Sequence, residues 1–134
     1  MATLDLYNQN SKLYTAIAME DITYEQFKHQ ILLPKHRFAN SLAFIEKHYL
    51  YQPQAFRNGD IANSAYENQG ACKILGLALL EDLNTEEALL AFGEHYRHVL
   101  ATPDGSDHAN IRQLLKHGLE SVHFNQLPLS RLVV

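Results

Sequence analysis

Residues 69–82 read QGACKILGLALLED, and this stretch carries the pattern that decides the fold. Its apolar residues recur at helical spacing and leave little of the surface polar: Cys72, Ile74, Leu75, Leu77, Ala78 and Leu79. Asn68 precedes the first turn, where asparagine is a preferred N-cap. A helix that is apolar on most sides must be covered by other elements. The stretch therefore predicts a central helix with the rest of the domain packed around it.

Two helices are predicted before the central one. Thr23 and Gln26 have the spacing of a capping box, in which each side chain bonds the other residue's backbone N–H. Pro34 should end that helix, because proline disfavours helical backbone in the residue ahead of it. Phe38 begins the apolar repeat of a second helix, which runs through Lys47.

Two more helices are predicted after the central one. Asn84 and Glu87 form another cap, and the helical pattern then continues to about Leu100 as a single helix. Asp107 stands in the N-cap position of the last helix. Gly118 follows that helix, at the place where glycine commonly ends one.

Short strands and an apolar tail complete the pattern. Residues 49–57 and 120–124 alternate in polarity and predict a small antiparallel sheet. The Asn- and Gly-rich residues 58–70 indicate an ordered loop. Residues 127–134 form an apolar tail that has to pack on the domain or meet a partner. The expected fold class is α+β, mainly helical with about five helices and a small antiparallel sheet.

The composition is that of a globular chain, with 46% hydrophobic residues and a net charge of −4 over 134 residues. A chain of this length forms one domain and buries roughly two thirds of the surface that its unfolded form exposes. We expect an N-terminal arm at residues 1–22 and a single globular domain at residues 23–134.

Charge and cysteine content argue against several classes of protein. The eleven Lys and Arg residues are scattered, so they form no basic stripe for nucleic-acid phosphates. No apolar run approaches the roughly 18 residues that a membrane span needs. Cys72 is the only cysteine, and the N-terminus lacks the basic and apolar regions of a signal peptide. We therefore expect a cytoplasmic protein with neither nucleic acid nor membrane as a partner.

The turn and helix at residues 103–112 are the strongest candidate for a functional surface. Asp107 and His108 stand at the expected helix start, where a polar ligand could be held and acid–base chemistry performed. Structural roles compete with this interpretation, because capping explains Asp107 and the turn explains Gly105. Neither capping nor the turn explains His108, Asn110 or Arg112.

The lone thiol and the paired histidines offer weaker chemistry. Cys72 precedes His108 in the chain order of papain-like hydrolases, but it shares the apolar helix face, which indicates a buried, inert thiol. His95 and His98 lie three apart on a helix, a spacing that would let them share a metal with Asp107 or His108. Surface histidines are the simpler interpretation, so we expect no metal and no cofactor.

Several motifs resemble the HopJ family, named for a plant-pathogen type III effector. They are Asn58-Gly59, Asn63, Asn68-x-Gly70-x-Cys72-Lys73, Phe92-Gly93-x-x-Tyr96-Arg97 and Pro103-x-Gly105-x-Asp107-His108-x-Asn110-Ile111-Arg112. The resemblance runs from about Tyr24 to Pro128. Tyr66, Ala71 and Leu119 depart from it, standing where Gly, Ser and Trp are usual. The family brings no known reaction or catalytic residues, and its name implies secretion through a type III system as the alternative to a cytoplasmic location.

Two functions remain open, and neither includes a defined reaction. The first is binding of a small polar ligand by polar residues at loop–helix junctions, where binding residues commonly lie: His108, Asn110, Arg112, Asn63, Asn68, Arg97 and Asp107. The second is a non-catalytic interaction module, or an effector that acts on a host partner. The apolar tail at residues 127–134 motivates the second function.

Overall fold

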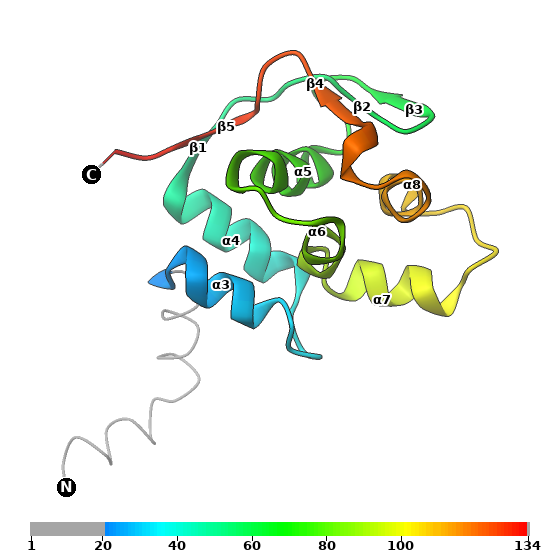
Figure 1. Ribbon diagram of the computed structural model, residues 1–134, viewed down its shortest axis with the longest axis horizontal. Helices are drawn as coiled ribbons and strands as arrows, with labels where there is room; N and C mark the ends of the chain where they lie inside the picture. The colour runs from blue at the N-terminus through cyan, green and yellow to red at the C-terminus, as the bar shows by residue number, and fades with distance from the viewer. Residues whose placement is uncertain (1–20, 134) are drawn as a thin grey trace, which may run out of the picture.

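The computed structural model describes residues 21–133 (Figure 1). In that range the helices are α3 (Tyr24–Gln30), α4 (Phe38–His48), α5 (Gln69–Glu81), α6 (Thr85–Ala91), α7 (Glu94–Ala101), α8 (Ala109–His117) and the short 3₁₀ helix η1 (Leu119–Ser121). The strands are β1 (Tyr49–Tyr51), β2 (Phe56–Asn58), β3 (Ile61–Asn63), β4 (Val122–Phe124) and β5 (Leu129–Arg131). The expected α+β, mainly helical class is confirmed. Residues 1–20 of the predicted arm lie outside the described part of the chain.

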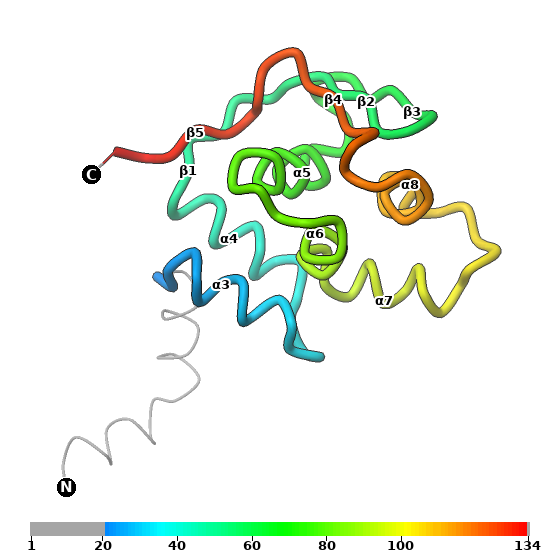
Figure 2. Tube along the Cα trace, in the orientation of Figure 1, coloured from blue at the N-terminus to red at the C-terminus, as the bar shows by residue number. Residues whose placement is uncertain are grey.

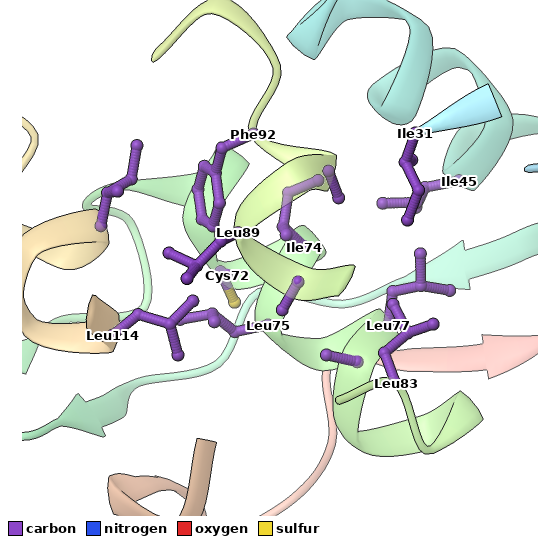
Figure 3. Close-up of a cluster of buried hydrophobic side chains, with 14 of the residues drawn as sticks. Ile31, Ile45, Cys72, Ile74, Leu75, Leu77, Leu83, Leu89, Phe92 and Leu114 are labelled. Carbon is purple, nitrogen blue, oxygen red and sulfur yellow. The ribbon is translucent and has the colours of Figure 1, made fainter. Parts of the chain in front are cut away.

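Helix α5 is central, as the apolar stretch predicted. It contacts α4, α6 and β5. Helices α4 and α6 lie on one side of α5, and the strands lie on the other (Figure 1). Its buried residues are Cys72, Ile74, Leu75, Gly76, Leu77 and Ala78. Figure 3 shows several of them meeting apolar side chains from the neighbouring helices, among them Ile45, Leu89 and Leu114. This single cluster holds the helices together.

The strands form two small antiparallel sheets instead of the single sheet predicted. The expected pairing of the two segments holds for β2 and β4, where Phe56 lies opposite Phe124. β1 pairs with β5 instead, so Tyr49 lies opposite Arg131. β3 falls inside the stretch predicted to be a loop and pairs with β2. Pro53, which has no N–H to donate to a ladder, lies between β1 and β2, where the sheets divide.

The apolar tail packs on the domain through Pro128 and Leu129. Figure 2 shows the C-terminal segment running beside β1. Pro128 is fully buried and Leu129 is only 4% exposed, whereas Leu132 and Val133 are exposed. Gly76 makes this approach possible, because a Cβ at that position would collide with the ring of Pro128.

The helix predicted from residue 85 to about 100 is two helices, α6 and α7. Gly93 separates them with a φ of +59°, a backbone conformation that favours glycine. A Cβ there would lie 2.5 Å from the backbone nitrogen of Phe38. The break brings the start of α7 against the start of α4, where Glu94 Oε1 accepts a 2.7 Å hydrogen bond from the Phe38 N–H.

Candidate functional site

A pocket of about 350 Å³ lies where the N-termini of α5 and α8 meet. Asn68, Gly70 and Ala71 belong to the start of α5. Four consecutive residues, 108–111, belong to the start of α8. The full lining is Phe38, Asn68, Gly70, Ala71, Phe92, His95, His108, Ala109, Asn110 and Ile111. Two helix starts, distant in sequence, therefore open onto one concave site.

Both helices begin with an unusual N-cap residue. Asn68 has φ 51° and ψ 47°, and His108 has φ 52° and ψ 50°, so both are left-handed. Neither side chain caps its helix, and neither first turn contains an acidic residue. The first N–H groups of a helix have no partner within it. At α5 and α8 these donors are therefore left for solvent or a ligand in the pocket.

Two other helices, α3 and α6, cap their first turns conventionally, whereas α4 and α7 have no side-chain cap either. The side chains of Thr23 and Asn84 accept from the N3 backbone N–H of α3 and α6, respectively, and both capping boxes are complete. These two sequence predictions are confirmed. The starts of α5 and α8 differ from those of α3 and α6 in that neither has a capping side chain.

The predicted capping roles of Asn68 and Asp107 are wrong. The Asn68 amide instead donates to Asn63 Oδ1 at 2.8 Å. Asp107 lies one residue before the actual N-cap, His108, and its carboxylate accepts from Arg112 Nη2 at 2.7 Å. Hydrogen bonds with residues five positions away in the sequence therefore take both side chains away from the helix ends they were expected to cap.

A buried group of asparagines fixes the pocket floor. Asn58, Asn63 and Asn110 are 0%, 5% and 6% exposed. Asn58 Nδ2 donates to the backbone oxygen of Asn110 at 2.9 Å, and to its Oδ1 at 3.0 Å. Buried amides need such partners, because an unpaired one costs about 1–3 kcal/mol. The group holds the start of α8 against β2 and β3.

Aromatic rings form another part of the pocket lining. The rings of Phe38 and Phe92 are nearly parallel, with centroids 6.1 Å apart. His95 meets Phe38 edge-on at 4.8 Å, and its ring lies 4.8 Å from that of His108. A Cβ at Gly70 would lie 2.5 Å from Phe38 Cζ, so glycine allows the ring to rest on the start of α5.

The charges around the pocket have defined states. Burial lowers the pKa of His108, with a further contribution from neighbouring His95, so its imidazole is neutral at pH 7. The hydrogen bond from Arg112 is the main cause that lowers the pKa of Asp107, which stays ionised. Asp107 is exposed and is not a lining residue, and none of the described residues that line the pocket carries a carboxylate.

The structure divides the predicted ligand-binding residues. Asn68, His108 and Asn110 line the pocket, while Asn63 lies behind it and supports Asn110 through hydrogen bonds. The other three predicted residues, Arg97, Asp107 and Arg112, do not line it. Arg112 faces a separate hollow that includes Pro103 and Leu115, and Arg97 is exposed.

The sequence prediction missed the apolar wall and much of the α5 start. The missed lining residues are Phe38, Gly70, Ala71, Phe92, His95, Ala109 and Ile111. Phe92 and Gly70 belong to the family-like motifs and were available as a signal. Ala109 carried no such signal, because what it contributes to the pocket is a backbone N–H at a helix start.

Cys72 is buried, as its place on the apolar helix face predicted. It is 1% exposed, and its thiol donates to the backbone oxygen of Gln54 at 3.6 Å. Burial raises the pKa of the thiol above its usual value. Cys72 is not among the residues that line the pocket with His108. The hydrolase interpretation therefore has no geometric support.

Comparisons with known proteins place the chain in a family. The family model described as HopJ type III effector protein matches residues 24–129. The crystal structure of the protein of unknown function VPA0580 is similar, with 37% identity and a TM-score of 0.76. That match covers 82% of this chain and 94% of the other. The search of curated proteins found no match. Over the described residues, no helix is both long and apolar enough to cross a membrane. The chain belongs to the HopJ type III effector protein family.

Proposed function

We propose that this protein binds a small organic anion in the pocket between the starts of α5 and α8. One observation carries the proposal: two helix N-termini without capping side chains or first-turn carboxylates open onto the same pocket. A helix N-terminus offers N–H donors and a partial positive charge of about one half of an elementary charge. Two such ends suit a carboxylate or phosphate group.

The pocket also suits an apolar body attached to that anionic group. Phe38 and Phe92 supply aromatic surface, and Ile111 adds an aliphatic side chain. A volume of about 350 Å³ lies at the small end of ligand sites, which range over roughly 300–1,000 Å³. The geometry therefore favours a compact metabolite over a nucleotide-sized ligand.

The two histidines add adjustable hydrogen bonding. A neutral imidazole has one donor and one acceptor nitrogen, and burial favours this neutral form in His108. His95 lies beside it on the pocket lining. These groups suit recognition of hydroxyl or carbonyl groups on the ligand. The proposal is of binding, and it assigns no reaction.

A protein-interaction or effector role is the second candidate, and the family description supports it. Its structural motivation was the apolar tail, but Pro128 and Leu129 are buried and β5 pairs with β1. That pairing leaves Leu132 and Val133 exposed at the end of the tail. We place the protein in the cytoplasm, with secretion as the alternative. A translocation reporter fused to the full chain distinguishes the two locations.

A thermal-shift screen of small carboxylates, phosphates and sulfonates tests the binding proposal. At about 100 times the Kd, a ligand should raise the Tm by roughly 10 °C. The key variant is Ala109→Asp, because Ala109 is exposed in the first turn of α8. Its carboxylate would occupy the positive helix end while leaving the fold intact.

The matched control is Ala109→Asn, because an asparagine side chain has nearly the same shape as an aspartate but carries no charge. We expect one or more anions to stabilise the wild type and Ala109→Asn, and to leave Ala109→Asp unchanged. The proposal fails if no anion stabilises the wild type at millimolar concentration. It also fails if Ala109→Asp responds as the wild type does.

A further inference from the structure

Three side chains able to bind a metal lie together at the outer edge of the pocket. They are His98 from α7, and Asp107 and His108 from the approach to α8. One ligand atom from each lies within 4.8 Å of the other two. None of the hydrogen bonds that hold the pocket floor uses these side chains.

One carboxylate oxygen is the centre of this cluster. Asp107 Oδ2 lies 3.1 Å from His98 Nε2 and 4.0 Å from His108 Nε2. In a tetrahedral zinc site with bonds of about 2.0–2.1 Å, neighbouring ligand atoms are about 3.3 Å apart. The His98–Asp107 pair already has that spacing. The His98 and Asp107 side chains are 52% and 54% exposed, so they have room to rotate. A modest rotation would shorten the distance from Asp107 Oδ2 to His108 Nε2 to that spacing.

Arg112 orients the carboxylate of Asp107. Arg112 Nη2 donates to Asp107 Oδ1 at 2.7 Å, which leaves Oδ2 facing the two imidazoles. Metal-bound carboxylates are commonly held by such outer partners.

The backbone conformation of His108 directs its imidazole towards the histidines of α7. Its φ of +52° is left-handed, which costs a residue other than glycine about 1–2 kcal/mol. Capping does not explain the cost, because the His108 side chain caps nothing. The conformation does place its imidazole between His95 and His98, at ring distances of 4.8 and 5.6 Å.

We propose that His98, Asp107 and His108 bind a divalent transition-metal ion, with Zn²⁺ as the first probe. Two imidazoles and one carboxylate form a ligand set that zinc and neighbouring first-row metals accept. Three protein ligands leave one tetrahedral position for water or a ligand from the pocket, which His108 also lines. The proposal stands independently of anion binding.

This proposal departs from our sequence-based expectation of no metal. The sequence interpretation paired His95 with His98 and considered Asp107 or His108 as a further ligand, but it preferred surface histidines. In the structure His95 packs edge-on against Phe38, and the cluster combines His98 with both residues of the turn that follows α7.

Calorimetric titration of the untagged full chain with Zn²⁺ tests the proposal, together with the absorption spectrum of bound Co²⁺. We expect one ion per chain and the visible bands of tetrahedral Co²⁺. His98→Ala and Asp107→Asn should each weaken binding by at least about 10-fold. Equal Tm values in EDTA for His98→Ala and the wild type would show that the fold is kept.

The matched control is His117→Ala. His117 Nε2 also contacts a carboxylate, Asp60 Oδ2, at 3.3 Å, but that pair lies outside the three-residue cluster. We expect this variant to bind zinc as the wild type does. The proposal is overturned if the wild type binds no zinc below about 1 mM, or if His117→Ala loses as much affinity as His98→Ala. Running the anion screen in EDTA separates this outcome from failure of the proposed function.

Discussion

The side chains of Asn63 and Asn110 exchange two hydrogen bonds. Asn63 Nδ2 donates to Asn110 Oδ1 at 3.2 Å, and Asn110 Nδ2 donates to Asn63 Oδ1 at 3.0 Å. This reciprocal pair joins the end of β3 to the first turn of α8. The position of one helix start at the pocket therefore depends on a buried amide pair, with Asn58 as its third member.

Replacing Asn110 with alanine should lower the free energy of unfolding by about 2–3 kcal/mol. The substitution leaves the Asn63 amide without both of its Asn110 bonds in a buried site, and unpaired buried groups cost about 1–3 kcal/mol each. Urea denaturation measures the loss. Asn125→Ala is the control, because Asn125 is exposed and should change stability by less than about 0.5 kcal/mol. A similar loss in both variants would contradict the structural role.

His36 should make the fold sensitive to acid. It is 2% exposed, its Nε2 lies 2.7 Å from Ser41 Oγ, and Ser41 Oγ donates to the backbone oxygen of Ala91. Because the hydroxyl hydrogen is engaged with Ala91, the Nε2–H of His36 is the donor to Ser41. Its Nδ1 is then a buried nitrogen with no hydrogen-bond partner among residues 21–133. Protonating that nitrogen is unfavourable.

Burial, and to a lesser degree Arg97, lowers the pKa of His36 to about 4. Below pH 6.5 the unfolded chain takes up a proton that the folded chain does not, so stability falls as the pH falls. By pH 4 the loss from this residue should reach about 3 kcal/mol. Urea denaturation across pH 4–7 measures it. His36→Gln should flatten the slope, whereas exposed His123→Ala should keep it. An unchanged slope in His36→Gln would count against the buried neutral imidazole.

Cys72 should react with thiol reagents only when the chain unfolds. The residue is 1% exposed, and burial raises the pKa of its thiol. A chromogenic disulfide reagent at pH 8 should label the native protein at the rate of unfolding, and label the chain in urea at once. Fast labelling of the native protein would return Cys72 to consideration as a reactive group.

Two glycines against Phe38 should differ in their tolerance of a methyl group. At Gly93 a Cβ would meet the Phe38 backbone nitrogen, and the φ of +59° is unfavourable for alanine. At Gly70 the Cβ would meet only the ring of Phe38, which is able to move. Gly93→Ala should therefore cost about 3 kcal/mol or more, and Gly70→Ala about 1 kcal/mol. Thermal unfolding compares them, and a reversed order would contradict the described packing.

The sequence predicted the elements whose signals are local. The apolar face around Leu75 and the two capping boxes were each readable within a few residues. Gly93 was not readable as a break, because a single glycine is tolerated inside a helix and only its contact with Phe38 decides the outcome. The pairing of β1 with β5 was equally hidden, since it depends on the tail returning across α5.

The candidate site was only partly predictable from the sequence. His108, Asn110 and Asn68 were identified as polar residues at loop–helix junctions, and the structure places them around one pocket. The capping assignments of Asn68 and Asp107 failed because partners five residues away in the sequence, Asn63 and Arg112, engage these side chains instead. What marks the pocket is a pair of left-handed N-caps, and backbone angles of that kind leave little trace in sequence.

A titration of the ¹⁵N-labelled protein with inorganic phosphate, followed by NMR, tests the proposed anion site most directly. The account predicts that the backbone amides of Gly70, Ala71, Ala109 and Asn110 shift together and saturate with one common Kd. The Ala109→Asp variant should show no such shifts, and Ala109→Asn should retain them. Amides at the two helix starts that stay unmoved, or drift linearly with phosphate while signals elsewhere saturate, would contradict the central claim.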